Sequence, residues 1–131
     1  MSKKTILGTA INSSPTVILP AGADLTDIRY RALAVSNGAL VLPAAGANAL
    51  GIAIGETDDV SAGEDMTVQI KDIGKWEAAA AVAAGAELAT DADGKAVAAA
   101  SGKFIVGVAL TAATAAGDIV QVQITKSGYK A

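Results

Sequence analysis

The sequence of 131 residues contains no cysteine and no histidine. Without cysteine the chain has no disulfide framework, no thiolate metal site and no thiol nucleophile. Without histidine it has no Ser-His-Asp triad, no imidazole metal ligand and no side chain that ordinarily titrates near neutral pH. These two absences do not exclude catalysis, but they remove the side chains that the commonest catalytic and metal-binding arrangements need.

Aromatic residues are scarce as well, at 3% of the chain, although 52% of it is hydrophobic. Alanine accounts for about a quarter of the residues, so larger apolar side chains make up only about 28%. The length fits one domain. We therefore expect one thin core of small side chains, and too few large ones for a second core.

Positive charge is also limited, with 10 basic against 13 acidic residues, a net charge of -3 and a pI near 4.7. Binding of nucleic acid depends on a clustered basic face, so no nucleic-acid partner is expected.

Residues 32–55 carry no charge and could span a bilayer by length alone. Turn residues such as Asn37, Gly38 and Pro43 would leave backbone groups unpaired in lipid, so we expect buried strands and no membrane partner. The N-terminus lacks the apolar segment of a secretory signal.

An internal repeat is the strongest feature of the sequence. The segment AGEDMTVQI at 62–70 aligns without a gap on AGDIVQVQI at 116–124. Just upstream, GIAI at 51–54 matches GVAL at 107–110. A strand, a polar connection, an Ala-Gly-acid turn and an alternating strand therefore occur twice. Weaker Ala-Gly turns at 21–25 and 84–88 support a domain of duplicated hairpins.

Hydrophobic periodicity predicts β-strands along the repeat. Val120, Val122 and Ile124 alternate with two glutamines, as expected for a strand with one apolar and one polar face. Asp93-Gly94 predicts a hairpin between 87–90 and 95–99, in place of the helix that alanine propensity favours over 77–88. The expected fold class is all-β, a small β-barrel or sandwich of duplicated hairpins. The β-domain should span 26–126, with a solvated tail at 127–131.

The first 25 residues differ from the rest and predict an extended N-terminal arm. Pro20 cannot donate to a β-ladder, which confines its segment to an edge or an extended arm. A basic tip suits an acidic protein surface, where the backbone of the arm could add to a partner's sheet edge. The candidate contact residues of this arm are Lys3, Lys4, Ile6, Leu7, Val17 and Ile18.

Two further features are candidates for an interface. Arg29, Tyr30 and Arg31 form the only compact basic-aromatic cluster, which could contact phosphate but in an acidic chain more readily serves a protein interface. Trp76, the single tryptophan, anchors either the core or an interface.

Acidic residues do not form a recognisable site. Asp91, Asp93 and Gly94 resemble the start of a calcium loop, but the closing glutamate is missing and the segment fits an ordinary turn. The acids between 58 and 65 fit a solvated loop. No metal, cofactor or catalytic residue is therefore expected.

Five motifs follow one another in the second half of the chain. They are the Ala-Gly turn at 84–88, the hairpin at 91–97, the strand at 107–110, the closing Ala-Ala-Gly-Asp turn at 115–118 and the Val-rich strand at 120–124. In this order they resemble the cement, or head-decoration, proteins of tailed-phage capsids. The resemblance covers about residues 38–125 and does not extend to the arm.

The resemblance implies a structural virion protein without enzymatic activity or cofactor. Such a protein binds the outer surface of an icosahedral head, stabilises contacts between major capsid subunits, and is often a homotrimer. It is made in the host cytoplasm and located in the virion. One alternative is a small β-module of a fibre or surface layer that binds a carbohydrate or protein ligand, although such modules expose more aromatics. The other is a carboxylate enzyme, which needs an acid of raised pKa in a cleft.

Overall fold

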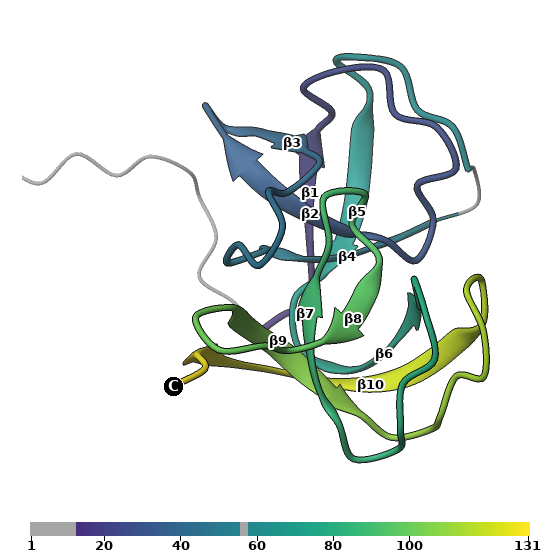
Figure 1. The fold of residues 1–131 in the computed structure, drawn as a ribbon. Helices are drawn as coiled ribbons and strands as arrows, with labels where there is room; N and C mark the ends of the chain where they lie inside the picture. Colours follow the sequence, from purple (N-terminus) through teal and green to yellow (C-terminus); the bar gives the residue numbers. More distant parts are fainter. Residues whose placement is uncertain (1–12, 56–57) are drawn as a thin grey trace, which may run out of the picture.

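The computed structural model describes residues 13–55 and 58–131, which form two antiparallel five-stranded sheets (Figure 1). The first sheet has the order β1-β5-β4-β2-β3, and the second has the order β6-β10-β9-β7-β8. The strands are β1 (Thr16–Pro20), β2 (Ala32–Ser36), β3 (Ala39–Val41), β4 (Gly51–Ile54), β5 (Asp65–Gln69), β6 (Asp72–Glu77), β7 (Glu87–Thr90), β8 (Ala96–Ala98), β9 (Phe104–Ala109) and β10 (Ile119–Tyr129).

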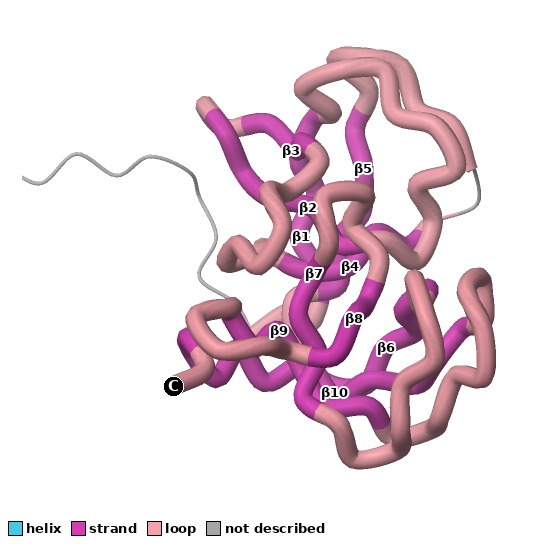
Figure 2. The backbone as a smooth tube through the Cα atoms, viewed as in Figure 1, coloured by secondary structure: helices cyan, strands magenta, loops and turns pink. Residues whose placement is uncertain are grey.

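Strands and loops account for the whole described part of the chain, which contains no helix (Figure 2). The expected all-β class is confirmed, and the two sheets form a sandwich-like arrangement without closing into a barrel. No helix that could cross a membrane is found in the described residues. The hairpin expected around Asp93-Gly94 is β7–β8, where Thr90 pairs with Ala96.

The two sheets are copies of one unit. Unit 1 comprises β1–β5 (residues 16–69) and unit 2 comprises β6–β10 (residues 72–129), and the strand order of unit 2 is that of unit 1 with each number raised by five. The repeat found in the sequence corresponds to β4–β5 and β9–β10. Its register is identical in both copies, because Ile52 pairs with Gln69 as Val108 pairs with Gln123. The duplication therefore extends well beyond the repeat.

Backbone hydrogen bonds outside the strands repeat in the same way. The amide of Ala21 donates to Glu64, as the amide of Ala78 donates to Asp118. In unit 1, Leu25 of the β1–β2 loop pairs with Val60 of the β4–β5 loop. In unit 2, Val82 of the β6–β7 loop pairs in the same way with Ala113 of the β9–β10 loop. Few side chains are shared at these positions, so the backbone bonds preserve the unit.

One glycine in each unit is required by the close approach of the neighbouring strand. A Cβ atom on Gly51 would lie 2.1 Å from the carbonyl oxygen of Gln69, and one on Gly107 would lie 2.4 Å from that of Gln123. Both distances are far below van der Waals contact. Gly51 begins the segment GIAI and Gly107 begins the matching segment GVAL. The close packing of the β4–β5 and β9–β10 pairs therefore requires a glycine at this position in both copies.

The buried residues form two hydrophobic clusters, so the expectation of a single core is wrong. The cluster of unit 1 contains Leu33, Leu40 and Val68 among others. The larger cluster contains Trp76, Leu88 and Val120 among others from unit 2, together with Ala32, Ala49 and Ile52 from unit 1. Duplication gives each unit a small core of its own, and three residues of unit 1 extend the second core across the joint.

The described part of the predicted arm belongs to the folded domain. Thr16–Pro20 is an edge strand paired with β5, and its Val17 and Leu19 pack against the core of unit 1. Ala21 and Leu25, which follow the strand, are themselves buried members of that core. The boundary at residue 25 is therefore wrong, although Pro20 does lie at a sheet edge. The tip of the arm, with Lys3, Lys4, Ile6 and Leu7, lies outside the described residues.

The predicted tail at 127–131 also differs from the structure. β10 continues to Tyr129, because after an irregularity between Ile124 and Gly128 the strand pairs again with β9. Tyr129 lies opposite Phe104, with their rings 5.1 Å apart and edge to face. This second pairing segment makes β10 eleven residues long, whereas its counterpart β5 has five.

Candidate interaction surfaces

The basic-aromatic cluster lies at the joint between the units, where each arginine meets a carboxylate. The guanidinium of Arg31 is 3.0 Å from Asp27 and 3.6 Å from Glu77, and the side chain of Arg31 is only 14% exposed. Arg29 lies 3.4 Å from Asp58. The structure therefore uses the charge of both arginines in ion pairs within the chain, which leaves less of it to attract a partner.

Tyr30 occupies a position where unit 2 has a glycine. Its amide donates to Ala53, as the amide of Gly85 donates to Ala109, and both residues have a positive φ, 63° and 85°. The carbonyl of Tyr30 accepts a hydrogen bond from the amide of Glu77 at 2.9 Å. Tyr30 therefore has a strained backbone and joins unit 1 to unit 2.

Trp76 is completely buried and anchors the joint from unit 2. Its indole Nε1 donates to the carbonyl oxygen of Gly94 at 2.8 Å, and the same oxygen accepts from the amide of Ala32 at 2.7 Å. Of the two roles expected for Trp76, the structure shows the core role. The β7–β8 turn thus connects the units, a role that the Asp-Gly hairpin motif did not reveal.

Lys126 fastens the two units on another side of the joint. Its ammonium group contacts the side-chain oxygen of Asn48 and the carbonyl oxygen of Ala49, and lies 5.2 Å from the centre of the Phe104 ring. Partial burial lowers the pKa of Lys126 below its ordinary value. No sequence pattern marked this residue, because its partners are distant in the chain.

The acidic motifs stabilise turns. Asp91 accepts hydrogen bonds from the amides of Asp93 and Lys95, which supports the turn interpretation of that segment. Asp118 accepts from the amide and hydroxyl of Thr114 and from the amide of Ala115, and these bonds hold its pKa below the ordinary value. Within the described residues no three acidic side chains gather as metal ligands would.

The outer face of the second sheet exposes large apolar side chains. Ile73 is 60% exposed and Ile119 is 43% exposed. They lie on the same face as Lys75, because β6 and β10 pair Ile73 with Gln123, Lys75 with Gln121 and Glu77 with Ile119. A groove of 420 Å³ runs along this face, lined by Tyr30, Lys75, Thr111, Ile119, Val120 and Gln121. Sequence reasoning missed this face because it singled out only the inward, alternating residues of β10.

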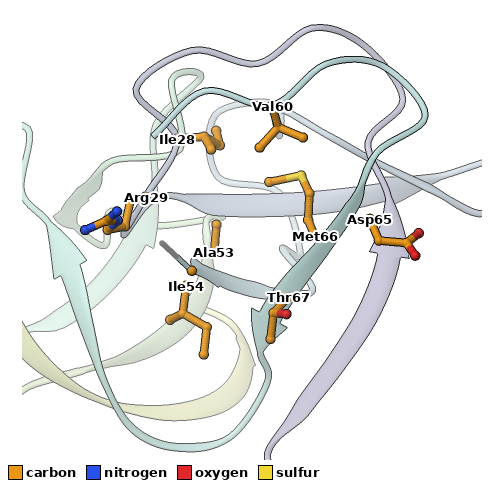
Figure 3. A pocket seen from close by; sticks show the side chains of 9 residues that line it. Ile28, Arg29, Ala53, Ile54, Val60, Asp65, Met66 and Thr67 are labelled. Atoms are coloured by element: carbon orange, nitrogen blue, oxygen red, sulfur yellow. The ribbon is translucent and has the colours of Figure 1, made fainter. Parts of the chain in front are cut away.

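The outer face of the first sheet is exposed along β1 and β5. Ile18 is 63% exposed, whereas its neighbour Val17 packs against the core, so only one of the two predicted contact residues is available. Asp65 lies on the same face at the start of β5. It borders a pocket of 320 Å³, and Figure 3 shows its carboxylate pointing away from Ile54 and Met66.

Comparisons with known proteins found one matching family and a similar solved structure. The model of one family, described as phage cement protein, matches residues 21–124. Among solved structures, the N base of head fiber gp8.5 of bacteriophage phi29 is similar, with a TM-score of 0.69 and 23% sequence identity, over 88% of this chain and 98% of that chain. No curated protein matches the chain. The family match spans parts of both units.

Proposed function

Because the chain belongs to the phage cement protein family, we propose that it binds the outer surface of an icosahedral phage head and stabilises contacts between major capsid subunits. The observation that carries the proposal is the family match over residues 21–124. The role is structural and not enzymatic, the partner is the major capsid protein, and the location is the outside of the capsid. A homotrimer is the proposed binding form, and neither nucleic acid nor membrane is a partner.

The two-unit architecture suits this role. A chain with two joined units offers separate surfaces to two neighbouring subunits, and many weak contacts over a capsid lattice add up through multivalency. Of the predicted contact residues, Ile18, Arg29 and Tyr30 retain exposed or half-exposed side chains and stay in the proposal. So do Lys3, Lys4, Ile6 and Leu7, which lie outside the described residues. Arg31 is largely buried in its ion pairs and is no longer proposed as a contact. Trp76 and Val17 face the hydrophobic cores, so they are no longer proposed as contact residues.

Sedimentation with heads tests the proposal. Expanded heads prepared without the chain are mixed with increasing amounts of the purified protein and pelleted. We expect saturable binding at a fixed number of copies per head, and decorated heads that resist heating or low ionic strength better than bare heads. Failure to pellet with heads of its own phage would contradict the proposal.

A second candidate function is the base of a head fibre. It is favoured by the likeness to the N base of the phi29 head fiber, which is close in fold and nearly complete over that chain. Electron microscopy of decorated heads separates the two functions. Cement proteins give compact density across subunit boundaries, whereas a fibre base gives density at the foot of protruding fibres.

A further inference from the structure

The outer faces of the two units carry complementary residues at equivalent positions. In unit 1, Ile18 lies opposite Thr67 on β5. In unit 2, Lys75 lies opposite Gln121 on β10. Thr67 and Gln121 are equivalent residues of the two units. Ile18 on β1 and Lys75 on β6 therefore occupy equivalent positions, one on the outer face of each unit.

At the second equivalent position, unit 1 has the charged side chain and unit 2 has the isoleucine. Asp65 lies opposite Pro20 in unit 1, and Ile119 lies opposite Glu77 in unit 2. Unit 1 thus presents an isoleucine and a carboxylate, where unit 2 presents a lysine and an isoleucine. Each pair is diagonal across two antiparallel strands, so the spacing between its two members is the same in both units.

All four side chains are available to a partner. Ile18 and Ile119 are among the large apolar side chains that the chain exposes, and Ile119 lines the 420 Å³ groove beside Lys75. In the part of the chain that the structure describes, no carboxylate forms an ion pair with Lys75 and no basic group forms one with Asp65. Lys75 lies only over the ring of Tyr30, at 5.9 Å.

We propose that these faces form the contact between two copies of the chain. The unit 1 face of one copy packs on the unit 2 face of the next, which places Asp65 against Lys75 and Ile18 against the groove beside Ile119. The equal spacing within each pair allows both contacts to form together. The inference rests on the proposed function only in assigning a surface to the proposed homo-oligomer.

Charge decides which faces meet. In the same geometry, a contact of two unit 2 faces would set each Lys75 against an Ile119, and a contact of two unit 1 faces would set each Asp65 against an Ile18. Both arrangements would cover charges without pairing them. Pairing of unlike faces is attractive. Because the two patches differ, the contact is heterologous, and it closes into a ring if the rotation between copies allows.

Charge reversal on the full chain tests the contact in the absence of heads. Sedimentation velocity over a range of concentrations compares the unchanged chain with Lys75→Glu, Asp65→Lys and the double variant. Each single reversal should raise the dissociation constant of the oligomer about 10-fold, since it replaces attraction with repulsion at a partly exposed pair. The double variant should return to within about threefold of the unchanged chain, because it restores the pair with its signs exchanged.

Matched reversals away from the faces serve as controls. Lys103→Glu, in the loop between β8 and β9, and Asp93→Lys, in the turn between β7 and β8, are exposed, change the net charge by the same amounts and should leave the dissociation constant unchanged. Fluorescence of the buried Trp76 and circular dichroism establish that every variant is folded. A monomeric unchanged chain, single reversals without effect, or a double variant no better than the singles would each overturn the proposal.

Binding to heads, measured in parallel, separates this inference from the proposed function. If the reversals weaken binding to heads and leave self-association intact, the face docks on the capsid and the copy-to-copy contact is wrong. If self-association follows the expected pattern and no variant binds heads, the contact stands and the capsid function fails.

Discussion

Unit 1 and unit 2 share a hydrogen-bonded frame but differ in the chemistry of their loops. The loops between β1 and β2 and between β4 and β5 of unit 1 carry Asp24, Asp27, Asp58, Asp59 and Glu64. The corresponding loops of unit 2, at 78–86 and 110–118, are rich in alanine and carry one acid, Asp118. Figure 1 shows the two loop pairs at separate ends of the molecule.

The difference shows which part of the structure depends on side chains. The loops of both units are held by the same backbone bonds, such as Leu25 to Val60 and Val82 to Ala113. Their side chains could therefore diverge in charge without loss of the fold. The joint is different, because it depends on particular residues of both units, including Trp76, Arg31 and Lys126.

The largest effect expected is the loss of Trp76. Trp76→Ala should lower the free energy of unfolding by about 3–5 kcal/mol, because it removes a fully buried ring and its bond to Gly94. The equivalent residue of unit 1 is Leu19, which is only partly buried. Leu19→Ala should cost about half as much. Urea denaturation followed by circular dichroism measures both, and equal losses would show that the joint is no more sensitive than the edge of unit 1.

A smaller effect tests whether the two units are built alike. Gly51→Ala and Gly107→Ala should each cost about 3 kcal/mol, since each new Cβ meets the carbonyl oxygen of the neighbouring strand. Gly63→Ala and Gly117→Ala are the controls. They have φ values of 87° and 92° and open space around them, so each should cost only about 1 kcal/mol. A harmless change at either Gly51 or Gly107 would break the equivalence of the units.

The ion pairs of the joint should contribute less than its buried ring. Arg31→Gln should cost about 1–2 kcal/mol, because the guanidinium pairs with Asp27 and with the largely buried Glu77. Arg29→Gln, whose partner Asp58 is well exposed, should cost less than about 0.5 kcal/mol. Thermal melts in low and in 1 M salt check the order, which salt should compress but not invert.

The smallest effect concerns the turn of unit 2 and depends on pH. Asp118→Asn should lower the melting temperature at neutral pH, because the carboxylate accepts three hydrogen bonds. Since the folded state lowers the pKa of Asp118 below 3.8, this stabilisation is complete above that pH. It is lost as the pH falls through the folded pKa. The melting temperatures of the two proteins should therefore approach each other as the pH falls below 3.8, whereas a difference that does not shrink would assign the effect to packing.

The sequence predicted the parts of the fold that short motifs encode. Alternation marked β10, Asp93-Gly94 marked the β7–β8 hairpin, and the Ala-Gly-acid turns marked the duplicated strands. The duplication of β1–β3 in β6–β8 could not be predicted, because the backbone alone maintains it and residues such as Tyr30 and Gly85 share no chemistry. The joint and the exposed faces were missed for a related reason, since residues such as Lys126 and Asn48 meet only in the folded chain.

A cryo-electron microscopy map of heads decorated with the full chain tests the central claim most directly. The account predicts two-unit density on the outer surface of the head, repeated over the lattice and bridging neighbouring major capsid subunits. Density confined to the base of fibres, or heads that stay bare at saturating protein, would contradict it.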